Sequence, residues 1–351
     1  MIDAAFAIPG DVNTLTGGYA YARQLLKLMP DYDVEVHRLQ LSAAYPYPSD
    51  ADIEATRRVF SQLHPDTPLI VDGLAFGAMP PLLVNDIKSR IIALVHHPLA
   101  YETGLSTAQV RQFVTFERHA LAQAEQIIAT SASTGDLLVR EYGVSPAKLT
   151  IAMPGTMPAL RAQSSGSPPL LLAVGSIVPR KGYEVLIDAL TQVSELDWRL
   201  TIVGSTERDP KCVTQLREAI MKSGLRGRIT LAGEVPDREL QRHYARAHAF
   251  VMPSLFEGYG MVLTEAIARG LPIVCTTGGA IAETVPDNAA IKVEPGNAGV
   301  LADALHRLLS DSELRTNLAD AAWSAGRVLP RWEDCARIVA GVVKKVAGRA
   351  S

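Results

Sequence analysis

The sequence has few cysteines and no excess of positive charge. The sequence contains three cysteines, Cys212, Cys275 and Cys335. Their spacing matches neither a zinc site nor a disulfide framework, so we interpret them as ordinary buried thiols. The 34 Lys and Arg residues face 37 Asp and Glu residues, which gives a net charge of -3. A chain without a basic excess has little electrostatic attraction for a polyanion, so we expect no nucleic-acid partner.

Long apolar runs are missing as well. No window approaches the roughly 18 uninterrupted apolar residues that are typical of a membrane-spanning helix. The first residues, MIDAAFAIPG, lack the positive flank and the long apolar core of a signal peptide. We therefore expect a cytoplasmic protein without a transmembrane segment, and peripheral contact with a membrane stays open.

The chain does have material for a large core, because 48% of its 351 residues are apolar. This length exceeds what one hydrophobic core usually serves and favours two domains. Short β-rich runs alternate with helical-period stretches, as in α/β proteins whose parallel sheets are covered by helices. Strands are expected at residues 2–8, 34–39, 68–71, 90–95, 126–130, 149–152, 170–175, 199–203, 228–232, 249–252 and 272–275.

A small, polar and Pro-containing segment, RAQSSGSPP at 161–169, is typical of a linker. We therefore predict one Rossmann-like, doubly wound domain at 1–163, a second at 164–330, and a C-terminal helix at 331–351 that could pack back toward the first domain. Such domains bind ligands at the carboxyl ends of their strands. Two of them are expected to face an interdomain cleft.

The most informative segment is MPSLFEGYGMVLTEAIARGLPIVC at 252–275. A strand ends, a Gly-rich turn follows and a helix begins near Gly260, so the backbone N–H groups of Gly258, Tyr259, Gly260 and Met261 are expected to favour a phosphate. Glu257 precedes this turn and has an ordinary alternative role as a first-turn acid at the helix dipole.

Glu265 lies about one and a half turns into the same helix. A carboxylate inside an apolar helix needs a partner, and a ligand hydroxyl would serve. An ion pair on the helix surface is the alternative.

These residues resemble the retaining glycosyltransferases of family 4. Two glutamates separated by seven residues, followed by GLPIV at 270–274 and GGAIAE at 278–283, are similar to the family's glutamate segment. The resemblance covers most of the chain and is strongest at about 170–294. It implies the GT-B fold, in which the second domain holds most of a nucleotide-sugar donor and the first domain faces the acceptor.

The segment VGSIVPRKG at 174–182 resembles the family's motif at the start of the donor domain, where basic side chains hold the diphosphate. Lys181 matches the family's lysine. Ser176 occupies a position where many members have arginine, and Arg180 is the expected substitute for that cation. The alternative is an exposed basic pair at a helix start.

The family's pattern also implies the other contacts to the donor. Glu265 would bind ribose hydroxyls, and Glu257 would orient hydroxyls of the donor sugar. Val235, in the loop GEVP at 233–236, would meet the base through its backbone, and Ser254 would help to hold the phosphate turn.

In the first domain, the resemblance places Gly17 and Gly18 near the donor phosphates and His96 near the sugar. A Gly-Gly pair is more often only a turn. The neighbouring histidines His96 and His97 could also be ordinary loop residues, and without further ligands they do not make a metal site. Two Asp-x-Asp triplets, at 31–33 and 50–52, fall in polar turns, where solvated carboxylates are the expected interpretation.

We therefore expect a metal-independent retaining glycosyltransferase without an obligatory cofactor. It would move a hexose from a UDP- or GDP-sugar to a hydroxyl acceptor, which is a glycan, a lipid-linked compound or a small molecule, in polysaccharide or glycoconjugate biosynthesis. An epimerase or phosphorylase of the same fold and a non-catalytic nucleotide-sugar-binding subunit are the alternatives, and Ser176 slightly favours the last.

Overall fold

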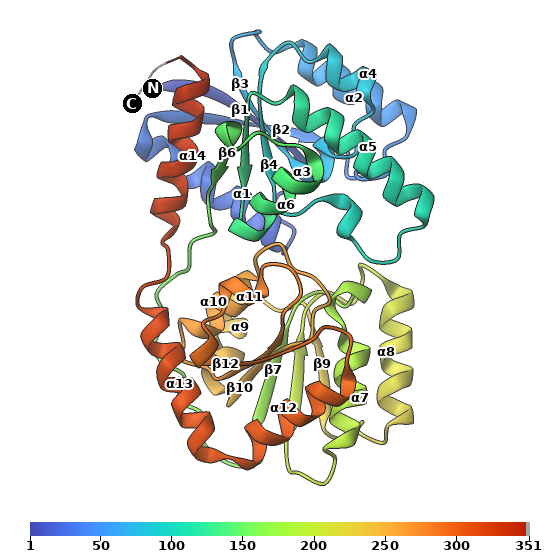
Figure 1. Ribbon diagram of the computed structural model, residues 1–351, viewed down its shortest axis with the longest axis vertical. Coiled ribbons are helices and arrows are strands. Elements are labelled where there is room, and N and C mark those ends of the chain that lie inside the picture. The colour runs from blue at the N-terminus through green and yellow to red at the C-terminus, as the bar shows by residue number, and fades with distance from the viewer. Residues whose placement is uncertain (349–351) are drawn as a thin grey trace. The chain divides into compact units, whose positions relative to one another are not determined.

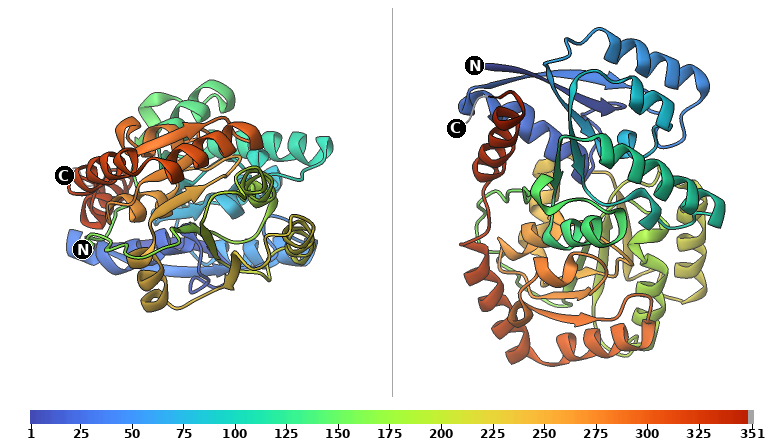
Figure 2. Two further views of the ribbon diagram at one scale, coloured as in Figure 1. Left: turned by 90° about the horizontal axis from the view of Figure 1, so that it is seen from below. Right: turned by 45° about the horizontal axis from the view of Figure 1, so that its top comes forward.

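The computed structural model describes residues 1–348, which form two units (Figure 1). The first unit comprises Met1–Gly155 and the segment from Pro330 to the end of the described residues. The second unit comprises Thr156–Leu329. Each unit is built around its own parallel sheet, with helices on both faces (Figures 1 and 2).

The first unit contains a six-stranded sheet in the order β2-β1-β3-β4-β5-β6. The strands β1, β3 and β4 are almost fully buried and consist mainly of apolar residues, as expected when helices cover both faces of a parallel sheet. The strands of this sheet are β1 (Ile2–Pro9), β2 (Val34–Leu41), β3 (Pro68–Asp72), β4 (Arg90–Val95), β5 (Gln126–Ala129) and β6 (Leu149–Ile151).

The helices of this unit begin at side-chain caps in several places. Ser49 and Ser106 each form a capping box, which starts α2 and α5. The helices are α1 (Gly17–Leu28), α2 (Asp50–Ser61), α3 (Gly73–Phe76), α4 (Pro81–Asp86), α5 (Thr107–Gln123), α6 (Ala132–Tyr142) and α14 (Trp332–Val346).

The C-terminal helix α14 packs in the first unit, beside α1 (Figure 1). Its apolar face is buried. The Sγ of Cys335 lies 3.1 Å from the hydroxyl of Tyr21 in α1, and Lys345 donates to the Gln126 side chain in β5. The last helix of the chain therefore completes the core of the first sheet.

The second unit contains a six-stranded sheet in the order β12-β11-β10-β7-β8-β9. Its strands are β7 (Leu170–Val174), β8 (Arg199–Val203), β9 (Ile229–Gly233), β10 (Ala249–Met252), β11 (Ile273–Thr276) and β12 (Ala290–Val293). Its helices are α7 (Tyr183–Gln192), α8 (Pro210–Lys222), α9 (Asp237–Arg246), α10 (Met261–Ile267), α11 (Ile281–Thr284), α12 (Ala298–Ser310) and α13 (Ser312–Gly326).

The predicted class, an α/β protein with two Rossmann-like units, is confirmed by these two sheets. Sequence reasoning misses β12, which is a short strand at the edge of its sheet and contains Lys292. The division of the chain falls between Gly155 and Thr156, whereas the linker composition places it at 163/164. The reason is local, because the Ala162 N–H donates to the Arg269 carbonyl and Arg161 pairs with Asp320, both within the second unit.

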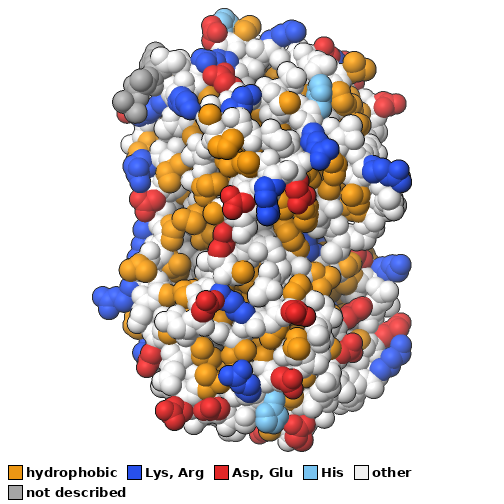
Figure 3. All heavy atoms as spheres, in the orientation of Figure 1, with side chains coloured by type: hydrophobic (Ala, Val, Ile, Leu, Met, Phe, Trp, Pro, Cys, Tyr) orange, Lys and Arg blue, Asp and Glu red, His pale blue; other side chains and the backbone are white. Residues whose placement is uncertain are grey.

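Within residues 1–348, no helix is long and apolar enough to cross a membrane. Acidic and basic side chains are interspersed on the face of the molecule that Figure 3 shows. This mixture is consistent with the small net charge of -3.

Candidate functional site

Three charged side chains meet at the carboxyl ends of the neighbouring strands β7 and β10. Arg180 and Lys181 lie in a short 3₁₀ turn, Pro179–Lys181, after β7, and Glu257 lies in the turn after β10. The Lys181 Nζ is 2.7 Å from Glu257 Oε1, and the Arg180 Nη1 is 3.0 Å from Glu257 Oε2. We call these three residues the charged cluster.

The charged cluster is largely removed from water. The side chains of Arg180, Lys181 and Glu257 are 15%, 14% and 9% exposed. Burial would raise the pKa of Glu257, but the charges of Lys181 and Arg180 outweigh it and lower that pKa to about 2. Glu257 is therefore ionised at neutral pH, and two cations around one carboxylate leave the cluster with a net positive charge.

Backbone contacts fix Glu257 in this position. Its N–H donates to the Gly278 carbonyl, and its carbonyl accepts from the Ala280 N–H at 2.8 Å. Gly279 has φ +68°, and a Cβ there would lie 2.3 Å from the Glu257 carbonyl oxygen. A side chain at position 279 would therefore displace Glu257.

The basic turn is held in the same way. The Arg180 Nη1 donates to the Phe256 carbonyl at 2.7 Å, and the Leu255 N–H donates to the Arg180 carbonyl. Gly182 ends the turn at φ +64°, where a Cβ would lie 2.3 Å from the Pro253 carbonyl oxygen. The turns after β7 and β10 are thus tied together through main chain as well as charge.

The Gly-rich turn after Glu257 leads into α10, which begins at Met261 after Gly260. The helix has seven residues, and no side chain caps its N terminus. Gly258 and Tyr259 lie in the turn itself. Ser254 is fully buried and its carbonyl accepts a hydrogen bond from Thr276, so it lies in the supporting layer beneath the turn.

Glu265 is held by a tyrosine that sequence reasoning misses. The Tyr244 hydroxyl, in α9, donates to Glu265 Oε2 at 2.9 Å. Arg269 covers the Tyr244 ring, with its guanidinium carbon 4.6 Å from the ring centre, and its Nη1 donates to the Glu265 backbone carbonyl. Burial raises the pKa of Glu265, whereas Tyr244 and Arg269 act to lower it.

Val235 lies just past the end of β9 and packs against an apolar cluster that includes Tyr244 and Leu263. Because the sheet order is β10-β7-β8-β9, its loop stands on the same carboxyl edge as the charged cluster. The second unit thus places Arg180, Lys181, Glu257 and Val235 in loops along one edge of one sheet.

In the first unit, the structure brings Gly18, His96 and Asp72 together. Gly17 and Gly18 open α1, and a Cβ on Gly18 would lie 3.4 Å from His96 Nε2. The buried Nε2 of His96 has no hydrogen-bond partner among the described residues, and Asp72 Oδ2 lies 3.7 Å from it. The edge of the Tyr21 ring contacts the His96 ring, with ring centres 5.3 Å apart.

The other polar candidates of the first unit have structural partners. His97 Nε2 lies 2.6 Å from Glu102 Oε1. Asp50 and Asp52 form the first turn of α2, where Asp52 completes the capping box with Ser49. Within residues 1–348, no group of three or more His, Cys, Asp or Glu side chains is arranged to hold a metal ion.

Asp72 and Tyr244 are the residues that the sequence did not reveal. Asp72 is the last residue of β3, one position beyond the predicted strand, and a single aspartate there also signals an ordinary turn. Tyr244 is fully buried in a helix, and a buried tyrosine hydroxyl needs a partner. The need for a hydrogen-bond partner is a signal that the sequence contains, but the sequence does not identify Glu265 as that partner.

Two doubly wound units, each with a six-stranded parallel sheet, make up a GT-B architecture. Family models match almost the whole chain: residues 160–324 match "Glycosyl transferases group 1", and residues 10–155 match "Glycosyl transferase 4-like domain". The chain belongs to the group 1, or family 4, glycosyltransferases. The family resemblance seen in the sequence is thereby confirmed.

Curated and structural relatives agree with this assignment. An MMP α-(1→4)-mannosyltransferase from Mycolicibacterium hassiacum is 25% identical over 333 residues, which cover 90% of this chain and 80% of that protein. Sucrose-phosphate synthase from Thermosynechococcus elongatus has the same fold, with a TM-score of 0.83, 20% identity and full coverage of both chains. Anabaena HepE in complex with UDP-glucose superposes with a TM-score of 0.78 at 15% identity, over 98% of this chain and 100% of that chain.

Proposed function

We propose that this glycosyltransferase moves a hexose from a nucleoside diphosphate sugar to an acceptor hydroxyl, with retention of the anomeric configuration. The observation that carries the proposal is the charged cluster at the carboxyl ends of β7 and β10. Its net positive charge suits a diphosphate, and its ionised carboxylate suits sugar hydroxyls. A fold neighbour, Anabaena HepE, was solved with UDP-glucose, which supports a nucleotide-sugar donor.

The residues of the second unit divide this work. Lys181 and Arg180 would bind the diphosphate, and Glu257 would turn from its cations to accept hydrogen bonds from the hexose. Glu265 would bind ribose hydroxyls, Val235 would meet the base, and the backbone of residues 258–261 would approach the phosphates. Ser254 would support that turn from beneath.

The first unit would supply Gly17 and Gly18 beside the donor phosphates and His96 beside the sugar. The buried Nε2 of His96, without a hydrogen-bond partner among the described residues, supports this role, because a ligand hydroxyl can supply the missing partner.

The proposed chemistry exchanges one bond to the anomeric carbon for another on the same face. The bond from the anomeric carbon to the leaving phosphate oxygen breaks, and a bond to the acceptor oxygen forms. The acceptor's proton passes to the leaving diphosphate. Because negative charge builds up on that diphosphate, fixed cations stabilise the transition state more than the ground state.

The experiment is a transfer assay with UDP- and GDP-sugars in the presence of a chelator. We expect release of one nucleoside diphosphate, and an NMR spectrum of the product with the donor's anomeric configuration. The opposite configuration would contradict retention. Activity that disappears with the chelator would contradict metal independence, and nucleotide binding without turnover would favour a non-catalytic subunit.

A further inference from the structure

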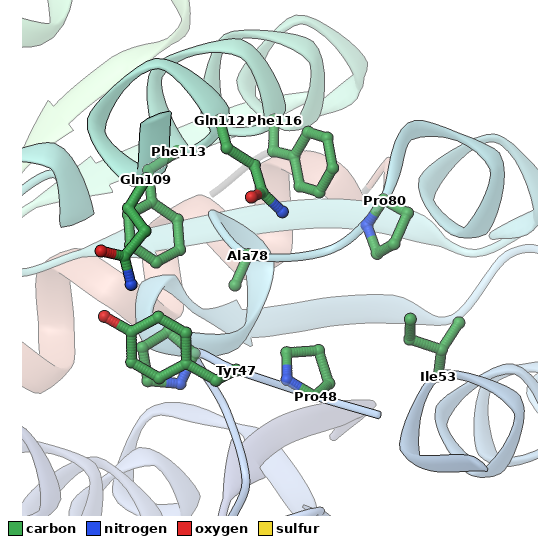
Figure 4. A pocket seen from close by; sticks show the side chains of 10 residues that line it. Tyr47, Pro48, Ile53, Ala78, Pro80, Gln109, Gln112, Phe113 and Phe116 are labelled. Atoms are coloured by element: carbon green, nitrogen blue, oxygen red, sulfur yellow. The ribbon is translucent and has the colours of Figure 1, made fainter. Parts of the chain in front are cut away.

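A cavity of about 300 Å³ lies in the first unit, apart from the residues discussed so far (Figure 4). Its walls are the loop 46–48 after β2, the start of α2, the connection 77–80 between α3 and α4, and the first half of α5. We call it the ring pocket. The loop 46–48, the connection and α5 all follow carboxyl ends of strands, which is the edge where doubly wound sheets bind ligands.

Contacts within the first unit hold much of the backbone around the ring pocket in place. Phe113 is 4% exposed and belongs to the hydrophobic core. The hydroxyl of Tyr45, next to the loop, lies 3.1 Å from the Thr56 hydroxyl of α2. Capping boxes hold the first turns of α2 and α5. A preformed site avoids the cost of ordering loops when a ligand binds.

The lining combines ring faces with neutral polar groups. Figure 4 shows Gln112, Phe113 and Phe116 of α5 on one side and Tyr47 and Pro48 on the other. Tyr47 is 57% exposed, and its ring packs at a tilt against the Phe113 ring, with the ring centres 5.8 Å apart. An exposed tyrosine held in this way offers a flat apolar face with a hydroxyl at its edge.

Two side-chain amides complete the pocket. The Oε1 of Gln109 accepts from the Ser106 N–H and hydroxyl, which leaves its NH₂ group for other partners. Gln112 lines the pocket with an exposed side chain, so its amide is accessible to a ligand. The two amides therefore offer donors and an acceptor beside the aromatic faces.

We propose that the ring pocket binds one neutral pyranose ring of the acceptor. The C–H face of a pyranose would pack on Tyr47 and Phe116, and its hydroxyls would bond to Gln112 and Gln109. The cavity lies at the lower end of the usual size of ligand pockets, which suits one ring better than an extended chain. This inference rests on the proposed function, because it assigns the ring to the acceptor.

Other ligand classes fit the lining less well. No charged side chain is among the described residues that line the pocket, so an anionic sugar would lose hydration without gaining a counter-ion. An alkyl chain would cover the amides of Gln109 and Gln112 without replacing the hydrogen bonds that they make to water.

The test is ligand-observed saturation-transfer NMR on the full chain with the methyl α-D-glycosides of mannose, glucose and galactose. Mannose 6-phosphate and 1-hexanol serve as the charged and the apolar probe. At least one neutral glycoside is expected to bind, and Gln112→Ala to weaken it about fivefold, the equivalent of one hydrogen bond. Gln123→Ala is the matched control, because it removes an exposed glutamine at the far end of α5, outside the pocket.

The inference is overturned if no glycoside binds at up to about 50 mM. Tighter binding of the phosphate or of hexanol that Gln112→Ala weakens and Gln123→Ala does not would overturn it too, as would equal effects of the two substitutions on glycoside binding. UDP and GDP binding is measured on the same samples. Nucleotide binding without glycoside binding would contradict only the proposed role of the ring pocket. Glycoside binding without nucleotide binding would support that role and contradict the proposed donor.

Discussion

Both units place candidate residues in loops at the carboxyl ends of parallel strands, but those of the second unit carry more charge. Arg180, Lys181 and Glu257 form a buried cluster there. The first unit instead places His96 Nε2, which has no hydrogen-bond partner in the described part of the chain, 3.7 Å from Asp72 Oδ2. Its ring pocket is lined by neutral side chains. We therefore propose that the shared topology determines where each unit would bind a ligand, and that the loops determine which ligand it would favour.

The largest loss is expected when a positive charge is removed from the charged cluster of the second unit. Lys181→Ala takes away a cation that contacts Glu257 at 2.7 Å. Loss of one preorganised group that stabilises the leaving group typically costs about 10²–10³ in kcat. We expect a fall of at least about 100-fold in the rate of sugar transfer, measured as release of nucleoside diphosphate.

The matched control is Lys222→Ala. Lys222 also pairs with a glutamate, Glu218, but in an exposed i,i+4 pair with the lysine side chain 79% exposed. We expect unchanged transfer from this variant. Full activity of the Lys181→Ala protein, or equal losses from both variants, would contradict the role of the charged cluster.

Glu257 in the second unit and Glu117 in the first unit respond to pH in opposite ways. The pKa of Glu257 is about 2, below its ordinary value of 4.5, so its contribution to stability is complete above about pH 4.5 and is lost as the pH falls toward 2. Burial raises the pKa of Glu117 in the first unit to about 8. The folded protein therefore favours the protonated form of Glu117. The stability that this group provides is complete below about pH 4.5 and is lost as the pH rises toward 8.

Glu117→Gln isolates this second effect. Glutamine keeps an oxygen for the Leu99 N–H, which donates to Glu117 Oε2 at 3.2 Å. Between pH 5.5 and 7.5, the free energy of unfolding of the unmodified protein should fall relative to the variant by up to about 1.4 kcal/mol per pH unit. Urea unfolding measures both proteins, and parallel pH curves would contradict the assignment.

Tyr244→Phe sharpens the comparison within the second unit. The change removes the hydroxyl that donates to Glu265 Oε2 and leaves the stacked ring in place. We expect about a fivefold to tenfold rise in the KM for the donor, with kcat nearly constant. The lost hydrogen bond lowered the pKa of Glu265, so the pKa of Glu265 should be higher in the variant. As the pH is lowered, Glu265 should therefore become protonated earlier, and the donor KM should start to rise at a higher pH than in the unmodified protein. A purely structural effect would leave that pH profile unshifted.

The smallest effect is expected at Gly18 in the first unit. A Cβ there would lie 3.4 Å from His96 Nε2, which is close contact without a hard overlap. Gly18→Ala should therefore narrow the space beside His96 and reduce kcat/KM about twofold to threefold. Gly104→Ala is an unsuitable control because Gly104 has φ +80°, whereas Gly227→Ala adds a methyl group into open space. Equal effects at positions 18 and 227 would contradict a role for the contact with His96.

The sequence predicts those parts of the fold that continuous apolar runs encode. The strands β4 and β10 have the bounds expected from their apolar residues. The edge strand β12 has only four residues and contains a lysine, so its pattern is too weak to distinguish it from a loop.

Sequence reasoning finds the residues of the charged cluster but not their geometry. Lys181 and Glu257 are each recognisable from their motifs, yet their contact joins residues 76 positions apart and depends on β7 and β10 being neighbours. Supporting residues are harder to find, because Tyr244 and Asp72 belong to no local motif. Their contacts with Glu265 and His96 can be identified only from the three-dimensional structure.

The central claim is that the charged cluster of the second unit binds a nucleoside diphosphate. Calorimetric titration of UDP and of GDP, in chelator, into the unmodified protein, Lys181→Ala and Lys222→Ala tests it most directly. The account predicts that one nucleotide binds the unmodified and Lys222→Ala proteins equally and the Lys181→Ala protein at least about tenfold more weakly. Equal affinity of all three proteins, or no binding of either nucleotide, would contradict it.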